Sequence, residues 1–180
     1  FKDLSGKDFQ IGAIILMKYS KHDNLNYKLG AYYNTELFGP LIVPLFGLYH
    51  LSKNKKFEAN LTLPFLADAN YRLHERLNVG INFNGLVRSY RLSEIPESDQ
   101  GGYVVKASNE VFSYLKFNLS KSLSIQTRVG YSIGRSYRVY NENDKITVGS
   151  ILIKVGDDRE QLNTDFEDGF VYQASLLYRF

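Results

Sequence analysis

Apolar and polar residues alternate along most of this chain, in runs that are long for a globular protein. The C-terminal run is the clearest, with every second residue apolar or aromatic: Phe170, Tyr172, Ala174, Leu176, Tyr178 and Phe180. A period of two indicates a β-strand with one apolar and one polar face. Globular strands usually have about five or six residues, whereas strands that cross a bilayer need about 9–11. The pattern therefore predicts a sheet of membrane-length strands.

The same alternation recurs and predicts nine strands. They cover residues 9–19, 27–37, 41–51, 57–63, 68–73, 77–92, 103–119, 123–133 and 170–180. Residues 41–51 are apolar on both faces and include Pro44, so their pattern is the weakest. No run carries apolar residues at the spacing of an amphipathic helix. We expect one all-β domain over residues 1–180, an antiparallel up-and-down transmembrane β-barrel.

The end of the chain favours a bacterial outer membrane. An aromatic residue, Phe180, closes the last strand. This resembles the C-terminal signal of outer-membrane barrels, which the barrel assembly machinery reads during insertion. We expect the six alternating residues of 170–180 to form that assembly signal and to face outer-membrane lipid. The alternative is a half-buried edge strand of a soluble sheet.

Composition excludes some classes of protein. The chain is 44% hydrophobic, yet no stretch approaches the 18 or so apolar residues of a helical membrane span. Its 14 Tyr and 12 Phe suit aromatic girdles at two membrane interfaces. There is no Cys, which excludes disulfides and thiol ligands. The net charge of +3 does not indicate a nucleic-acid partner, and we expect none.

Turn lengths predict the orientation of the barrel. Short turns belong on the periplasmic side and long loops outside. The short turns expected on the periplasmic side are residues 52–55, 74–76 and 120–122. Residues 38–40 and the turn near Pro64 are expected outside although they are short, which breaks the rule in that half of the barrel. The long polar segments 93–102 and 141–169 are expected outside. Within the long extracellular loop 141–169, residues 146–155 are expected to pair with 135–140 as a hairpin that projects beyond the membrane.

Strand parity carries a further expectation. Single-chain bacterial barrels usually have an even number of strands with both ends periplasmic. Nine strands therefore lead us to expect at least one more strand before Phe1, in a barrel of roughly 10–14 strands. Unpaired backbone amides in hydrocarbon cost several kcal/mol each, so an open sheet is not expected to persist in a bilayer.

Four short motifs resemble a known family. They are Asp8-Phe-Gln-Ile-Gly12, Glu36-Leu-Phe-Gly-Pro40, Leu61-Thr-Leu-Pro64 and Ala69-Asn-Tyr-Arg-Leu73. Together they are similar to the DUF6268 family of outer-membrane β-barrel proteins, which occurs mainly in Bacteroidota and hence in Gram-negative cell envelopes. The resemblance covers most of the chain. It implies an outer-membrane location, a longer N-terminus and no known catalytic residues.

The polar faces of the predicted strands are rich in basic residues. Alternation places these side chains towards the lumen: Lys18, Lys28, Lys56, Arg72, Arg88, Lys106, Lys116, Arg128, Arg138 and Arg179. Fewer acidic residues share that face: Glu36, Glu58, Asp68 and Glu110. If a water path exists, this excess should favour anions. Alternatively the charges pair and plug a barrel that is too narrow for a wide channel.

Catalytic and metal sites are not expected. His22, His50 and His74 fall in or beside predicted periplasmic turns, away from the outer loops where barrel hydrolases carry their active sites. Carboxylates in residues 157–168 could bind Ca²⁺, but their spacing does not match an EF-hand, and a solvated loop is the simpler interpretation. Gly101-Gly102 is ordinary turn chemistry. No cofactor is expected.

These observations lead to one main functional hypothesis and two alternatives. The main one is a non-enzymatic structural or accessory subunit of an envelope complex, with residues 38–51 as a flat lateral contact face for other outer-membrane proteins. The second is a narrow, anion-preferring channel or small-solute transporter. The third is a soluble lipid-binding barrel, which would fold without detergent.

Overall fold

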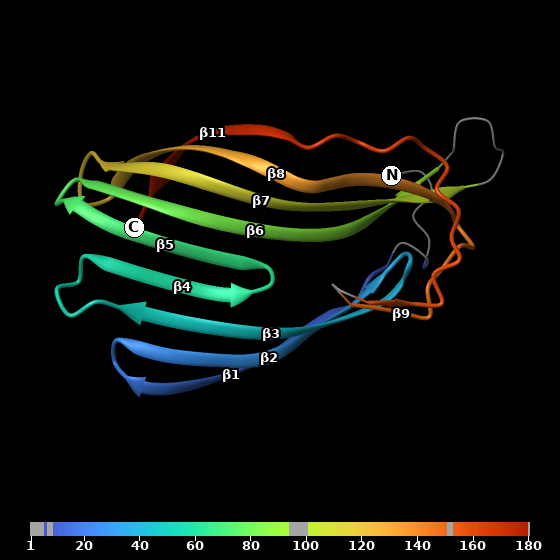
Figure 1. Cartoon of the computed structure of the whole chain (residues 1–180), viewed down its shortest axis with the longest axis horizontal. Helices are drawn as coiled ribbons and strands as arrows, with labels where there is room; N and C mark the ends of the chain where they lie inside the picture. Colours follow the sequence, from blue (N-terminus) through green and yellow to red (C-terminus); the bar gives the residue numbers. More distant parts are fainter. Residues whose placement is uncertain (1–5, 7–8, 94–100, 151–152, 180) are drawn as a thin grey trace.

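Nine long strands form the body of the molecule. The computed structural model describes residue 6 and residues 9–93, 101–150 and 153–179. The long strands are β1 (Gly12–His22), β2 (Leu25–Glu36), β3 (Gly39–Leu51), β4 (Phe57–Leu63), β5 (Leu66–His74), β6 (Leu77–Leu92), β7 (Gly102–Asn118), β8 (Leu123–Asn141) and β11 (Gly169–Tyr178). Each pairs antiparallel with the next along the chain (Figure 1). The predicted all-β, up-and-down antiparallel architecture is confirmed.

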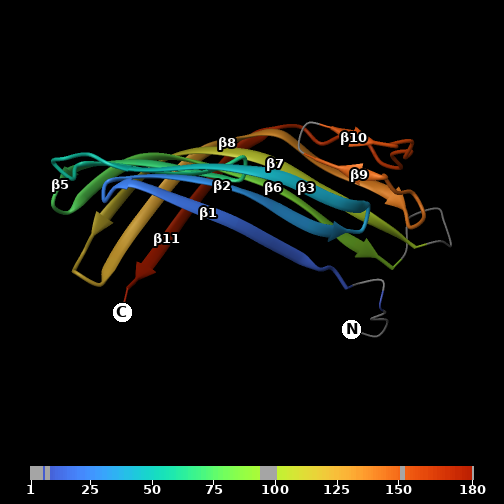
Figure 2. The same ribbon diagram turned by 90° about the horizontal axis from the view of Figure 1, so that it is seen from below.

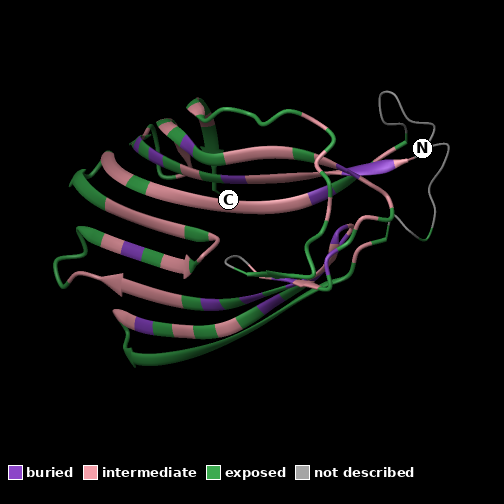
Figure 3. Cartoon of the chain, turned by 45° about the vertical axis from the view of Figure 1, so that its right-hand side comes forward, coloured by how far each residue is buried: buried purple, intermediate pink, exposed green. Residues whose placement is uncertain are grey.

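The sheet is open. Its strand order runs from β1 to β8 and then β11, so β1 and β11 are its two edges within the described part of the chain. Figure 2 shows that the sheet is strongly curved. Exposed positions run along both edge strands in Figure 3. Within the described residues, no helix is long and apolar enough to cross a membrane.

Connections differ between the two ends of the sheet. At one end, which we call the turn end, short segments join β1 to β2, β3 to β4, β5 to β6 and β7 to β8. At the other, the loop end, β6 and β7 are joined through residues 93–101, and β8 and β11 through residues 142–168. Residues 37–38 and 64–65 also lie at the loop end, where they join β2 to β3 and β4 to β5 by short turns. The predicted contrast between short turns and long loops therefore holds only from β5 to β11, and the side of a membrane that each end would face stays a prediction.

Two cross-strand pairs place an aromatic ring over a glycine. Gly80 lies opposite Tyr114, and Gly130 lies opposite Phe112. A Cβ on Gly130 would lie 2.3 Å from the Val111 carbonyl oxygen and 2.5 Å from Cδ1 of Phe112. The ring therefore lies flat on the sheet, and Phe112 is 1% exposed on an otherwise polar face. Glycine is needed at these positions because the backbone and the ring approach so closely.

A β-bulge reverses the faces of β8. Between the pairs Asn109–Ile133 and Ala107–Ser136, β8 advances by one residue more than β7. Gly134 has a φ of +64° within this bulge, in the left-handed region that favours glycine. Arg138 consequently pairs with Val105, on the face opposite to Lys106. The expectation that Arg138 shares the face of the other basic residues is wrong.

The hairpin expected within residues 135–155 also differs. Residues 136–141 continue β8 and pair with β7, because the bulge lets β8 run on past residue 133. The short strands β9 (Val148–Gly149) and β10 (Lys154–Val155) pair with each other instead. β9 also forms a single parallel bridge from Gly149 to Leu41 of β3. The described residues of 146–155 therefore do not pair with 135–140.

The hydrophobic core lies at the loop end (Figure 3). Leu41, Val43 and Leu45 of β3 are almost fully buried and belong to one cluster with Tyr103 of β7 and Tyr140 of β8. Val87 and Val105 pack against the same cluster. Alternation alone would place these last two side chains on the exposed apolar face of the sheet. Instead, β3 covers that side of β6 and β7 at this end.

A buried carboxylate fixes this packing. Oε2 of Glu36 accepts hydrogen bonds from the backbone N and the Oγ of Ser89, at 2.8 and 2.6 Å. Oε1 accepts one from Nδ2 of Asn34 at 2.6 Å, and Nη1 of Arg88 lies 3.6 Å away. Oγ of Ser89 also accepts a hydrogen bond from the backbone N of Leu37 at 2.7 Å. The contacts tie the end of β2 to β6.

We predict that Gly130→Ala lowers the free energy of unfolding by about 1–3 kcal/mol, because the added methyl group displaces Phe112 and the β7 backbone. Urea unfolding followed by far-ultraviolet circular dichroism measures the change. Gly101→Ala is the matched control, since its Cβ would approach no other atom closer than 3.4 Å. Equal stability of both variants would contradict the close ring–glycine packing.

We also predict that Glu36→Gln costs about 1–3 kcal/mol, because the amide NH2 cannot accept the hydrogen bonds that the carboxylate accepts. The same unfolding measurement applies. Glu160→Gln, an exposed carboxylate of the 142–168 connection, is the control. A Glu36→Gln variant as stable as the unmodified protein would show that the packing of β2 against β6 does not depend on this contact.

Candidate functional site: a polar basin at the turn end of the sheet

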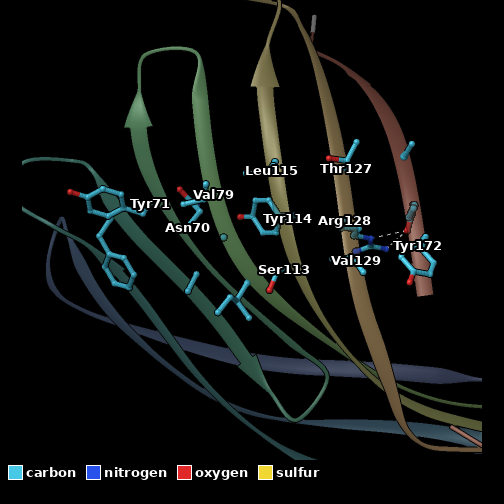
Figure 4. A pocket seen from close by; sticks show the side chains of 16 residues that line it. Asn70, Tyr71, Val79, Ser113, Tyr114, Leu115, Thr127, Arg128, Val129 and Tyr172 are labelled. Carbon is cyan, nitrogen blue, oxygen red and sulfur yellow. Dashed lines mark hydrogen bonds between the residues drawn. The ribbon is translucent and has the colours of Figure 1, made fainter. Parts of the chain in front are cut away.

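One face of the sheet is apolar and open to its surroundings. Phe170, Tyr172, Leu176 and Tyr178 of β11 are 66–74% exposed. Ala174 of the same row is exposed too, and Phe180 lies outside the described residues. Figure 4 shows Tyr71, Val79, Leu115, Val129 and Tyr172 around an apolar hollow of about 930 Å³ on neighbouring strands. The role of the alternating residues of 170–180 as an assembly signal stays a prediction.

The opposite face carries polar rows that cross several strands. Cross-strand partners share a face. Arg72, Asn78, Lys116 and Gln126 follow one another across β5 to β8. A second row runs from Glu58 through Asn70, Gly80, Tyr114 and Arg128 to Gln173. The register therefore puts Arg72, Lys116 and Arg128 on one face, as the alternation predicted.

A cavity of about 1,010 Å³ lies over the first of these rows, and we call it the polar basin. Its lining reaches from Glu58 and Asp68 to the β5–β6 and β7–β8 turns and to Arg179. Five basic residues line it: Arg72, Arg76, Lys116, Lys121 and Arg179. Three acidic residues line it: Glu58, Asp68 and Glu75. The basin therefore carries a formal excess of two positive charges.

Two cations of the polar basin, Arg72 and Lys116, have no acidic partner among the described residues. Arg72 and Lys116 lie two strands apart in one row, roughly 10 Å at the usual strand spacing. Neither side chain makes a hydrogen bond or ion pair with another described residue. Asp68, in contrast, accepts a hydrogen bond from the Tyr114 hydroxyl at 3.1 Å. Charges that are not neutralised locally can attract an anion that enters from solution.

Other predicted lumen-facing cations are engaged elsewhere. Arg128 stacks on Phe112, with its guanidinium carbon 4.1 Å from the ring centre, and its Nε donates to Oε1 of Gln173 at 2.8 Å. At the loop end, Arg88 donates to the Tyr32 hydroxyl at 3.0 Å, and Lys106 lies over the Tyr137 ring. The sequence grouped these residues with Arg72, Lys116 and Arg179, but only the last three line the polar basin.

Two acidic residues of the 142–168 connection, Asp157 and Asp168, already accept hydrogen bonds from the protein. Asp157 accepts hydrogen bonds from Nε and Nη2 of Arg159, at 2.7 and 2.9 Å. Asp168 accepts them from the backbone N of Gly134 and of Arg135, at 3.0 and 2.8 Å. These backbone hydrogen bonds lower the pKa of Asp168. No group of three or more His, Asp or Glu in the described residues could hold a metal ion.

Sequence reasoning missed Arg159. Its side chain is 2% exposed and lies over the rings of Phe38 and Tyr140, while Nη1 donates to the Tyr103 hydroxyl at 3.4 Å. Burial disfavours its charge, but the hydrogen bonds with Asp157 and Tyr103 outweigh this and raise its pKa. No periodic pattern surrounds residue 159, so alternation could not indicate that this loop arginine is buried.

The ion pair between Arg159 and Asp157 predicts that the free energy of unfolding depends on pH. Hydrogen bonds from Arg159 lower the pKa of Asp157 from 3.8 to about 2. The stabilisation is therefore complete above pH 3.8 and is lost as the pH falls through about 2. We expect Asp157→Asn to cost about 1–2 kcal/mol of unfolding free energy at neutral pH, allowing for the partial exposure of the carboxylate.

The measurement is urea unfolding of both proteins from neutral pH down to pH about 2. The difference between them should shrink to near zero at the acid end. Asp158→Asn, which removes the next charge along the chain, is the control. A difference between unmodified protein and Asp157→Asn that stays constant with pH would contradict the assignment.

Comparison with known proteins identifies the family. No curated protein and no solved structure matches the chain. The family described as a domain of unknown function, DUF6268, matches residues 1–146, which include β1 to β8 and most of the polar basin. The match confirms the resemblance of the four short motifs, and this chain belongs to the DUF6268 family.

Proposed function

We propose that this protein is a non-enzymatic β-barrel of a bacterial outer membrane whose polar face guides small anions. The observation that carries the proposal is the polar basin, with its excess of positive charge on the face opposite to the exposed apolar residues. Outer-membrane barrels have this division, with apolar side chains towards lipid and polar ones towards the lumen. A Gram-negative, Bacteroidota-type cell envelope is part of the same proposal.

The exposed apolar face supports a lipid environment. Ile15, Ile81 and Leu115 are 72%, 58% and 53% exposed, although they belong to three different strands. Monomeric soluble proteins rarely expose contiguous apolar patches beyond a few hundred Å². Lipid around this face would cover those side chains without a protein partner.

The charges of the polar basin support an anion preference. A ring or cluster of unpaired Arg and Lys side chains raises the local concentration of anions and lowers that of cations. Arg72 and Lys116 are the residues best placed for this role, because no described acidic side chain pairs with them. Arg179 extends the positive region to the end of β11.

We predict that the full-length protein in planar bilayers is more permeable to chloride than to potassium. Double charge reversal, Arg72→Glu with Lys116→Glu, should lower the anion-to-cation permeability ratio by about twofold or more. The reversal potential in a salt gradient measures the ratio. Lys145→Glu, at the loop end, should leave it unchanged. Cation selectivity of the unmodified protein, or the same shift in the control, would refute the proposal.

An accessory subunit of an envelope complex is the second proposal. This function would use residues 38–51 as an apolar contact face. Leu41, Val43 and Leu45 are buried in the core, whereas Ile42 and Phe46 are 48% and 57% exposed. The surface available to a partner is therefore narrower than the apolar run suggests. A stoichiometric partner that co-purifies in mild detergent would favour this function over the channel.

A further inference from the structure

A lateral slot interrupts the sheet at its loop end. β4 and β5 have 7 and 9 residues, whereas the flanking β3 and β6 have 13 and 16. The last β3–β4 pair is Phe46–Leu63, and the last β5–β6 pair is Leu66–Asn84. Among the described residues beyond the β4–β5 hairpin, β3 pairs with β2 and, through Leu41, with β9, but not with β6 (Figure 1). The tip of that hairpin, Pro64-Phe65, forms the floor of the slot.

A cavity of about 430 Å³ lies at the slot. Its volume falls within the range of about 300–1,000 Å³ that is usual for small-molecule sites. Phe65, Phe83 and Leu86 line it on the slot side, and Val105 and Ala107 line it on β7. Phe38, Leu41 and Ile146 line it where β3 meets the 142–168 connection. The walls are therefore largely hydrocarbon and aromatic.

The charged groups of this cavity are all basic. Among the described residues, Arg138, Lys154 and Arg159 are the charged side chains in its lining. Arg159 donates two hydrogen bonds to the Asp157 carboxylate, and Nζ of Lys154 lies 3.5 Å from the same carboxylate. Arg138 has only a 3.7 Å contact with Asp165, whose side chain is 73% exposed. Such a surface pair is weak, so Arg138 is the cation free to take a ligand.

We propose that this cavity binds one amphiphile with an apolar chain and a single anionic headgroup. The chain lies between Phe83, Val105 and Leu41, and the headgroup accepts hydrogen bonds from the guanidinium of Arg138. Charge-assisted hydrogen bonds to arginine are stronger than neutral ones. The cavity lies beside the gap in strand pairing between β3 and β6, and on this proposal the amphiphile enters it sideways from the surrounding lipid. The polar basin lies at the opposite end of the strands and is not involved.

The test uses a tryptophan reporter. The chain has no Trp, so a single introduced one is the only indole that can be quenched. Phe83→Trp places it in the cavity wall, and Phe117→Trp places it on the same face of the sheet near the turn end. Both full-length variants are reconstituted in detergent-free lipid nanodiscs and titrated with dodecanoate brominated at its terminal carbon.

Saturable quenching of Phe83→Trp is expected, with only the linear quenching of chains dissolved in lipid for Phe117→Trp. Arg138→Gln in the Phe83→Trp background should weaken binding about tenfold, and Arg138→Lys should restore part of it. Lys53→Gln, which removes an exposed charge from the β3–β4 turn, is the matched control. Brominated dodecanol should bind the unmodified reporter protein as weakly as dodecanoate binds Arg138→Gln.

Other results overturn the proposal. Linear quenching of both reporters would mean that the chain only dissolves in the bilayer and has no site. Equal affinity for dodecanoate and dodecanol would remove the role of Arg138. Ala107→Phe fills the cavity, so undiminished dodecanoate binding by that variant would place the ligand elsewhere. The dodecanol comparison needs no charge variant, so it decides the question even if Arg138→Gln does not fold.

Discussion

The two faces of the sheet depend on an uninterrupted ladder of backbone hydrogen bonds. β6 and β7 pair without a break from Leu77–Phe117 to Leu92–Gly102. Because side chains alternate strictly along such a ladder, a shift of one residue would exchange the apolar and polar faces. The exposed apolar rows and the polar basin therefore share one cause. Neither could exist without the register that places Arg72, Asn78 and Lys116 opposite one another.

The bulge at Gly134 divides the molecule into two regions of different chemistry. Between the bulge and the turn end, β5 to β8 place Arg72, Asn78, Lys116 and Gln126 on the face of the basin. Beyond the bulge, Arg138 and Tyr140 share a face with Val105 and Tyr103, and β3 packs against that face. The turn end thus offers open, charged surface, whereas the loop end offers an enclosed apolar cavity with a cationic rim. One chain carries both because a single extra residue in β8 changes which side chains meet.

Sequence periodicity predicts the part of this structure that is local. Each long strand could be located because alternation needs only neighbouring residues, and even the weak pattern of 41–51 forms β3. The bulge at Gly134 is not predicted, because the alternation is followed only to residue 133, and Arg138 is therefore assigned to the wrong face. The burial of Val87 against β3 and of Arg159 between two rings depends on contacts between distant segments. No period in the sequence encodes them.

The short β4–β5 hairpin explains why side-chain contacts and a cavity, and not a further strand, lie between β3 and β6 at the loop end. Where these strands stop, the neighbouring edges of β3 and β6 lose their pairing, and unpaired backbone groups away from water are costly. A few contacts replace part of this pairing. The Glu36 carboxylate accepts a hydrogen bond from the Ser89 amide on β6. The Phe38 carbonyl, just before β3, accepts one from the Ile146 amide, near the β9 bridge to Leu41. Side chains, unlike a strand, cover an edge only in places. The contacts at the two edges leave the cavity between them, and the bulge in β8 turns Arg138 towards that cavity.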